Sequence, residues 1–165
     1  MAEEIRRCEA AGATAAALAM AFISIDTMTF LSLPAGVEAQ GRMDFINWVD
    51  AYLKGHPDQP YQYRGIDVYG ARCAMLHSFG SAAQFHDRYG EALLFGYHDG
   101  GMHMHNPEVD PRLVMIGSAS FLNDVVSALS NFMEACSTSP ELKARVEPRL
   151  ARVLAVVPLP PSCQA

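Results

Sequence analysis

Apolar residues recur at helical spacing along most of the chain, and this pattern predicts a mostly α-helical protein. The first helical stretch begins with strong helix formers and stops before Pro34. Pro148 falls inside the last helical stretch, where we expect it to kink or interrupt the helix. The predicted helices cover residues 3 to about 31, 44–54, 65–80, 118 or 120 to 133, and 140 to about 156.

The segment between about residues 92 and 116 has few helix signals and predicts a small β insertion. Residues 92–97 and 102–105 are predicted to pair across a tight turn at Asp99-Gly100-Gly101, and residues 113–116 form a candidate third strand. We therefore expect a four- to five-helix bundle with an antiparallel hairpin or three-stranded insertion. This single domain would cover residues 1–157, followed by an extended Pro-rich tail at 158–165.

Nearly every side chain in the segment 65–80 is apolar, on every face of the predicted helix, so we expect this helix in the interior. Asp67 is a candidate N-cap and Gly80 a candidate left-handed C-terminal residue. The one full charge between residues 68 and 79 is Arg72, and His77 follows five residues later. A guanidinium in such a helix is costly unless it meets a carboxylate or a wet cleft.

Two kinds of explanation remain open for Arg72 and His77. In the structural one, Arg72 pairs with a carboxylate, for which Asp26 and Asp50 are the candidates, and His77 donates to a backbone carbonyl. In the functional one, both residues belong to a catalytic site or a non-catalytic binding site. Five residues on an ideal helix lie about 140° apart. A shared site therefore requires the helix to unwind near Gly80, or two chains to pool their motifs.

The residues around Arg72 and His77 resemble a known family. The motif Tyr69-Gly70-Ala71-Arg72-Cys73-Ala74-Met75-Leu76-His77 closes a buried helix and follows the helix that contains residues 45–53. This order is similar to that of the HEPN superfamily, whose members share a four- or five-helix bundle and an Arg-x(4–6)-His signature. The resemblance covers roughly residues 15–135. This chain has Cys73 where the family commonly has a polar residue after the arginine.

The resemblance implies a metal-independent endoribonuclease of a toxin or defence type, which works as a homodimer with the motif at the interface. Arg72 and His77 are the catalytic residues that it carries over. The chemistry is consistent, because cleavage through the RNA 2′-hydroxyl needs a base that titrates near neutrality. It also needs a cation for the charge that builds on the phosphate oxygens, which a guanidinium supplies. No cofactor is expected.

A second group of residues favours a different function. Three histidines, His98, His103 and His105, flank the predicted turn, and His103 and His105 would point to one face of a strand. Imidazoles grouped in this way are typical metal ligands, so the alternatives are a metal-binding protein or a solvent-exposed hairpin. A non-catalytic helical binding or dimerisation module is the remaining alternative.

Composition narrows the class of partner. The chain has 165 residues and a net charge of −6, which argues against broad DNA or RNA binding and favours a specific RNA, such as a structured loop. Its four cysteines are scattered without a Cys-x-x-Cys pair, which favours a reducing, cytoplasmic setting. The apolar run at 13–25 is too short to span a membrane and predicts a buried helix.

Overall fold

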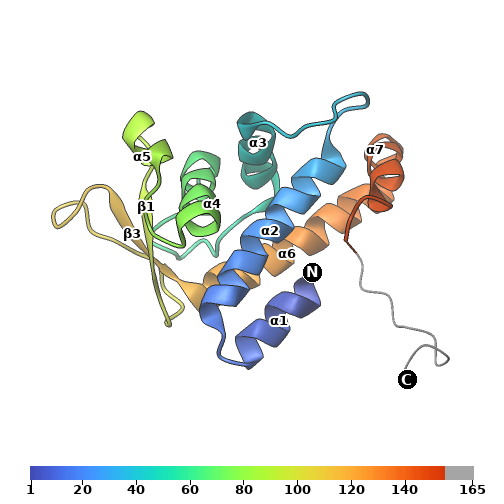
Figure 1. Cartoon of the computed structure of the whole chain (residues 1–165). Helices are drawn as coiled ribbons and strands as arrows, with labels where there is room; N and C mark the ends of the chain where they lie inside the picture. The colour runs from blue at the N-terminus through green and yellow to red at the C-terminus, as the bar shows by residue number, and fades with distance from the viewer. Residues whose placement is uncertain (155–165) are drawn as a thin grey trace, which may run out of the picture.

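The computed structural model describes residues 1–154 (Figure 1). These residues form seven helices and three short strands, in agreement with the helical periodicity that dominates the sequence. The protein is mostly helical, with one small mixed sheet. The elements are α1 (Ala2–Ala10), α2 (Thr14–Ser32), α3 (Arg42–Tyr52), α4 (Gly65–Ser78), α5 (Gln84–Arg88), β1 (Leu94–His98), β2 (Met104–His105), β3 (Leu113–Gly117), α6 (Ser118–Thr138) and α7 (Pro140–Leu150).

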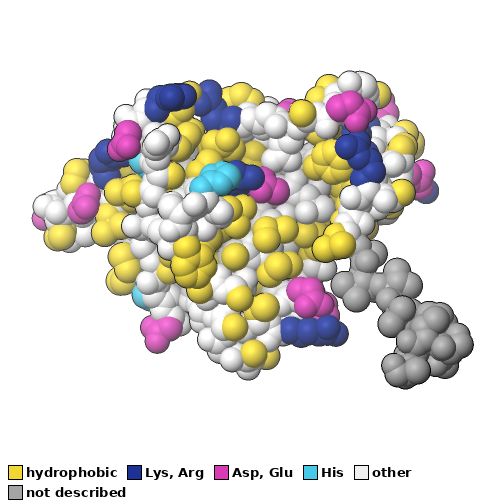
Figure 2. Space-filling model, in the orientation of Figure 1, with side chains coloured by type: hydrophobic (Ala, Val, Ile, Leu, Met, Phe, Trp, Pro, Cys, Tyr) yellow, Lys and Arg dark blue, Asp and Glu magenta, His cyan; other side chains and the backbone are white. Residues whose placement is uncertain are grey.

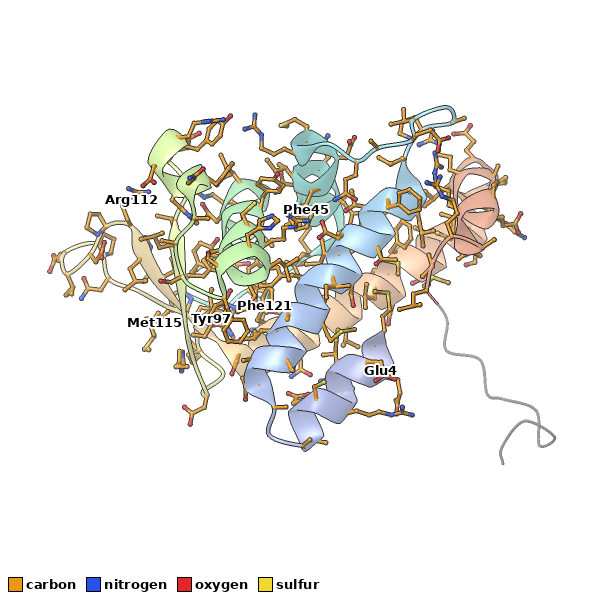
Figure 3. The ribbon with its side chains drawn as sticks, viewed as in Figure 1. Glu4, Phe45, Tyr97, Arg112, Met115 and Phe121 are labelled. Carbon is orange, nitrogen blue, oxygen red and sulfur yellow. The ribbon has the colours of Figure 1, made fainter. Side chains whose placement is uncertain are left out.

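The two longest helices, α2 and α6, cross the middle of the molecule, and the other elements pack around them (Figure 1). The rings of Phe22 in α2 and Phe121 in α6 are both fully buried, with centroids 5.3 Å apart. Trp48 and Phe45 bring α3 onto this core, and Figure 3 shows Phe45 and Phe121 among the side chains between the helices. Burying aromatic and aliphatic side chains of this size contributes about 1.5–3 kcal/mol each.

The prediction of one helix from residue 3 to about 31 is wrong, because the chain breaks between α1 and α2. Gly12 has a φ of +69°, a conformation that glycine adopts without steric cost. The alanines on both sides have high helix propensity and therefore mask the break in the sequence. The result is a helical hairpin in which α1 folds back along α2.

Helix α2 is longer than the sequence run at 13–25 indicates, since it extends from Thr14 to Ser32. Within the described part of the chain, it is the one helix with the length and composition needed to cross a membrane. Half of the apolar stretch of this helix is buried inside the fold, where α2 packs against α1, α3, α6 and α7. The buried helix predicted here is therefore present as a central packing element.

The sheet lies where the β insertion was predicted, but its pairing differs from the predicted antiparallel arrangement. β3 lies in the middle, parallel to β1 and antiparallel to β2. The turn at residues 99–101 therefore carries the chain over the end of β3 instead of closing a hairpin between β1 and β2. This crossing is close, because a Cβ at Gly117 would lie 2.6 Å from the carbonyl of Gly101.

The ends of α4 differ from their predicted caps. Asp67 lies inside the first turn, and Asp50 at the end of α3 instead accepts from the first N–H, that of Gly65, at 2.7 Å. At the other end, Phe79 takes the left-handed conformation predicted for Gly80, with φ 49°. The Phe79 and Gly80 N–H groups still bond back into the last turn, so the helix end is closed.

Helix α7 continues past Pro148 and ends at Leu150, short of the predicted end at about residue 156. Next to the proline, the nearly buried guanidinium of Arg149 donates to the carbonyls of Leu33, Pro34 and Val37. These bonds tie α7 to the chain that leaves α2. The rest of the predicted helix and the Pro-rich tail at 158–165 lie outside the described residues.

A fully buried carboxylate, that of Asp67, joins α4 to the sheet and to the loop before the helix. It accepts from Tyr61 Oη at 2.8 Å and from the backbone N–H of Leu93 at 2.8 Å. Two nitrogens of Arg64 also donate to it, each at 2.7 Å. Because a buried carboxylate needs this many partners, Asp67 fixes the position of α4.

We predict that Asp67→Ala lowers the free energy of unfolding by about 3 kcal/mol, because it leaves the Tyr61 hydroxyl and the Leu93 N–H without a partner in the interior. Arg64 adds little to this cost, since its side chain is 51% exposed and returns to water. The measurement is urea unfolding followed by circular dichroism.

Glu38→Ala is the matched control for the removal of a paired carboxylate. Its partner is Arg152, and both side chains are exposed, so the expected loss is below about 1 kcal/mol. Equal losses in the two variants would show that the Asp67 bonds do not anchor the fold.

Candidate functional site

Arg72 leaves α4 on the side that faces α2 and pairs there with Asp26. Its Nε atom donates to Asp26 Oδ2 at 2.8 Å, Nη2 forms an ion pair with the same oxygen at 2.8 Å, and each side chain is about one-fifth exposed. Partial burial disfavours the charged guanidinium, but the Asp26 carboxylate outweighs it, so the pKa of Arg72 is raised. Of the two predicted carboxylates, Asp26 is the partner, whereas Asp50 binds the start of α4.

A second residue holds Asp26 in place. The amide of Gln40, in the loop before α3, donates to Asp26 Oδ1 at 2.9 Å. Asp26 therefore uses one oxygen for Gln40 and the other for Arg72. Gln40 orients Asp26, and Asp26 in turn orients the guanidinium plane of Arg72.

The remaining nitrogen of the guanidinium reaches His77. Arg72 Nη1 lies 3.2 Å from His77 Nε2. Because a guanidinium can only donate, Nε2 accepts, and the ring is neutral with its proton on Nδ1. The α4 helix stays regular to Ser78, so the two residues meet through the length of the arginine side chain and not through unwinding near Gly80.

His77 also stands at the rim of a cavity of about 570 Å³ between the start of α3, α4 and α5. We call it the basic cleft, and the residues that line it include Arg42, Tyr69, Cys73, His77, Arg88 and Tyr89. On α4, the residues at 69, 73 and 77 recur every four positions, so they form one stripe along the cleft wall. Figure 2 shows a histidine beside a basic and an acidic side chain near the middle of the visible face.

Positive charge dominates the basic cleft. The guanidinium carbon of Arg42 lies 4.3 Å from the centroid of the Tyr89 ring. A hydrogen bond with the Tyr89 side chain raises the pKa of Arg42. Within the described part of the chain, no acidic side chain lines the cleft, and neither Arg42 nor Arg88 forms an ion pair. The cleft therefore suits an anionic ligand.

The three histidines of the predicted metal site do not converge. His98 accepts from the Gly100 N–H through Nδ1, and its Nε2 lies 2.8 Å from the carbonyl of Met102. His103 is fully buried, and both of its ring nitrogens have partners. Among residues 1–154, no group of three or more His, Cys, Asp or Glu side chains could hold a metal ion. The site geometry therefore gives the metal-binding alternative no support.

His103 belongs instead to a network of hydrogen bonds in the interior, and its partners there determine which ring nitrogen carries the proton. The Gly117 N–H donates to His103 Nδ1 at 3.1 Å, so the ring proton is on Nε2. Nε2 donates to the Tyr63 hydroxyl at 2.6 Å, and Tyr63 donates to Asp124 Oδ2 at 2.9 Å. Burial and the nearby His98 lower the pKa of His103 to about 4. The network of His103, Tyr63 and Asp124 attaches the sheet to α6.

The sequence predicted Arg72 and His77 as candidate site residues and Asp26 as one of two candidate partners, but it did not predict the rest of the site. Gln40, Arg42 and Arg88 are separated from the motif by 11 residues or more and carry no local signal. Ten of the twelve Lys and Arg residues are arginine, which indicates in general terms that a local basic patch is possible.

Comparisons with known proteins leave the site to be interpreted from its chemistry. No family model matches the sequence, and searches of curated proteins and of solved structures give no significant match. The class that the fold and site define is a mostly helical protein with an Asp–Arg–His chain at the rim of a basic cleft. The HEPN resemblance therefore stays a prediction.

We predict that protonation of His103 destabilises the protein in acid. Its folded pKa of about 4 lies below the ordinary value near 6.5, so the unfolded chain binds the proton first as the pH falls. This contribution is complete above about pH 6.5 and is lost, at about 1.4 kcal/mol per pH unit, until the pH reaches about 4. Urea unfolding at a series of pH values measures it.

His103→Gln should remove this part of the pH dependence, whereas His56→Gln should retain it, because the His56 side chain is 71% exposed. If His103→Gln and the unmodified protein lose stability in parallel between pH 6.5 and 4, protonation of the His103 imidazole is not the cause of the loss of stability in acid.

Proposed function

We propose that this protein is a HEPN-like, metal-independent endoribonuclease with Arg72 and His77 as its catalytic residues. The observation that carries the proposal is the 3.2 Å contact between Arg72 Nη1 and His77 Nε2 at the rim of the basic cleft. The proposal includes a four- to five-helix bundle and a homodimer, which the resemblance implies. It also includes a specific RNA, which the acidic net charge favours, and a cytoplasmic location, which the scattered cysteines favour.

His77 supplies the base in this proposal. Its Nε2 carries a lone pair in the resting protein, where it accepts from Arg72. When a phosphate oxygen takes over the Arg72 N–H, Nε2 is released to remove the proton of the RNA 2′-hydroxyl. The 2′-oxygen attacks phosphorus and the bond to the 5′-oxygen breaks. The products are a 2′,3′-cyclic phosphate and a 5′-hydroxyl, whose proton comes from the imidazolium or water.

Arg72 supplies positive charge where the transition state gains negative charge. Asp26 fixes two of its nitrogens, so the guanidinium is oriented before RNA binds. Asp26 and Gln40 act as positioning residues in this scheme, since they reach the reacting atoms only through Arg72. The exposure of His77 at the rim leaves room for a substrate phosphate beside both residues.

We predict that His77→Ala lowers the rate of RNA cleavage by at least about a hundredfold, because it removes the base. Arg72→Lys should lower it by a similar factor, since lysine keeps the charge but lacks the guanidinium fork. Cleavage of a labelled RNA in the presence of a chelator, with analysis of the product ends, measures the rate and the expected 2′,3′-cyclic phosphate.

His56→Ala is the control, because it removes an exposed imidazole of another loop and should leave the rate unchanged. Cleavage that the chelator abolishes, or that survives in purified His77→Ala with a normal circular dichroism spectrum, would refute the proposed mechanism.

The second expectation concerns assembly. A groove of about 940 Å³ lies on the other side of Arg72, and Met20, Ile23, Thr27 and Phe30 of α2 form its wall. Ile23 is 40% exposed, and these four residues follow the helical repeat of a single face. Because Asp26 and Arg72 also line this groove, a second copy bound here would place the motif at the interface.

We predict a homodimer that dissociates in Ile23→Glu, because a carboxylate on the apolar wall would be desolvated by the partner. Light scattering during gel filtration measures the mass. Val109→Glu introduces the same charge at an 82% exposed position in the loop after β2 and should remain dimeric. A monomer at every accessible concentration, or dissociation in both variants, contradicts this interface.

A further inference from the structure

We propose that the basic cleft is a binding site for one unpaired nucleotide of the RNA, next to the phosphate that is cleaved. The base enters the cleft, and further phosphates of the strand bind Arg42 and Arg88. This inference rests on the proposed function, because His77 joins the cleft to the catalytic contact. It identifies the substrate as a single-stranded region of RNA.

The size and position of the cleft support a nucleotide. Its volume of about 570 Å³ falls within the range of small-ligand sites, roughly 300–1,000 Å³. His77 is part of its wall, so a ligand inside lies beside the imidazole that faces Arg72. A nucleotide that fills the cleft therefore places an adjacent phosphate at the rim, where Arg72 and His77 meet.

The charges of the cleft fit phosphates. Arg42 comes from the start of α3 and Arg88 from the end of α5, and both side chains line the cleft. Neither pairs with a carboxylate within the described residues, although the protein as a whole carries a net charge of −6. Two arginines left without ion-pair partners in one cavity are available to bind an anion with two charged groups.

The aromatic side chains of the cleft fit a base better than a bare phosphate. Tyr69, Phe85 and Tyr89 all line it, and the Phe85 and Tyr89 rings lie 4.6 Å apart at 33°. Gln84 and Ser78 add neutral donors and acceptors that can bond to the edge of a base. Proteins that read single-stranded nucleic acid combine such aromatic surfaces with basic side chains along the backbone. A base within a duplex is stacked and paired, and cannot enter.

The test measures the binding of a short 2′-O-methyl RNA strand, which cannot be cleaved because the attacking hydroxyl is capped. Fluorescence anisotropy compares this strand with a duplex of the same sequence and with an abasic strand that keeps only the sugars and phosphates. We expect the duplex to bind at least about tenfold more weakly, and the abasic strand about tenfold more weakly, because it lacks the stacking surface.

Two variants test the arginines. Arg42→Gln and Arg88→Gln should each weaken binding about tenfold and reduce the slope of log affinity against log salt by about 0.7, the value for one phosphate contact to a single strand. Arg145→Gln is the matched control, because it removes the same charge from an exposed position on α7 and should change neither quantity measurably.

The outcomes separate this inference from the proposed function. Equal binding of the normal and abasic strands, equal binding of strand and duplex, or equal loss in Arg145→Gln would each overturn the nucleotide site, even if the protein cleaves RNA through His77. Binding that follows the expected pattern would support the site, even if all-ribose RNA stays uncleaved. In that case the endoribonuclease proposal alone fails.

Discussion

The buried carboxylate of Asp67 is the interaction on which the rest of the site depends. It connects the loop before α4, the first turn of α4 and the chain that enters β1. A carboxylate in the first turn of a helix also interacts favourably with the helix dipole. The bonds of Asp67 to three parts of the chain restrain the rotation of α4 about its axis. This orientation of α4 directs Arg72 towards α2 and directs Tyr69, Cys73 and His77 towards the basic cleft.

The ion pair between Arg72 and Asp26 joins α4 to α2 and also orients the guanidinium group of the candidate site. The sequence alone left a choice between a structural arginine and a catalytic one. In the structure, two guanidinium nitrogens face Asp26 and the third faces His77, so the structural pairing is present together with the contact on which the proposed function rests. Because the pair is about one-fifth exposed, it is neither sealed in the core nor fully screened by water. In the proposed mechanism, a substrate phosphate reaches this partly exposed guanidinium without breaking the Asp26 bonds.

The sequence predicted the elements better than their pairing. Helical periodicity located α3, α4, α6 and the start of α7, because each helix shows its buried face locally. The order of the strands could not be predicted in this way. β3 enters between β1 and β2, and that choice depends on contacts such as the close approach of Gly101 to Gly117, which lie 16 residues apart. The short helix α5 also has too few residues to show a periodicity.

The prediction of the candidate site from the sequence was incomplete for the same reason, because it too depends on contacts between elements that are distant in the sequence. The ideal helix separates Arg72 and His77 by about 140°, and only the reach of the arginine side chain closes this angle. Asp26 and Asp50 were equivalent candidates, because the choice between them depends on which neighbouring helix faces each side of α4. Arg42 and Arg88 join the site through the packing of α3 and α5, for which the motif gives no indication.

The use of arginine across the molecule explains how an acidic protein presents a basic cleft. Seven of the ten arginines, all within residues 1–154, donate to carboxylates or backbone carbonyls of the protein itself: Arg6, Arg7, Arg64, Arg72, Arg112, Arg149 and Arg152. Of the three that do not, two line the basic cleft and the third, Arg145, lies on α7. Structural bonds thus neutralise most of the positive charge, and the acidic surface disfavours non-specific contact with nucleic acid. Two of the three arginines that remain available stand beside His77 in the basic cleft, so the nucleotide site that we propose would draw its electrostatic attraction for RNA from this one place.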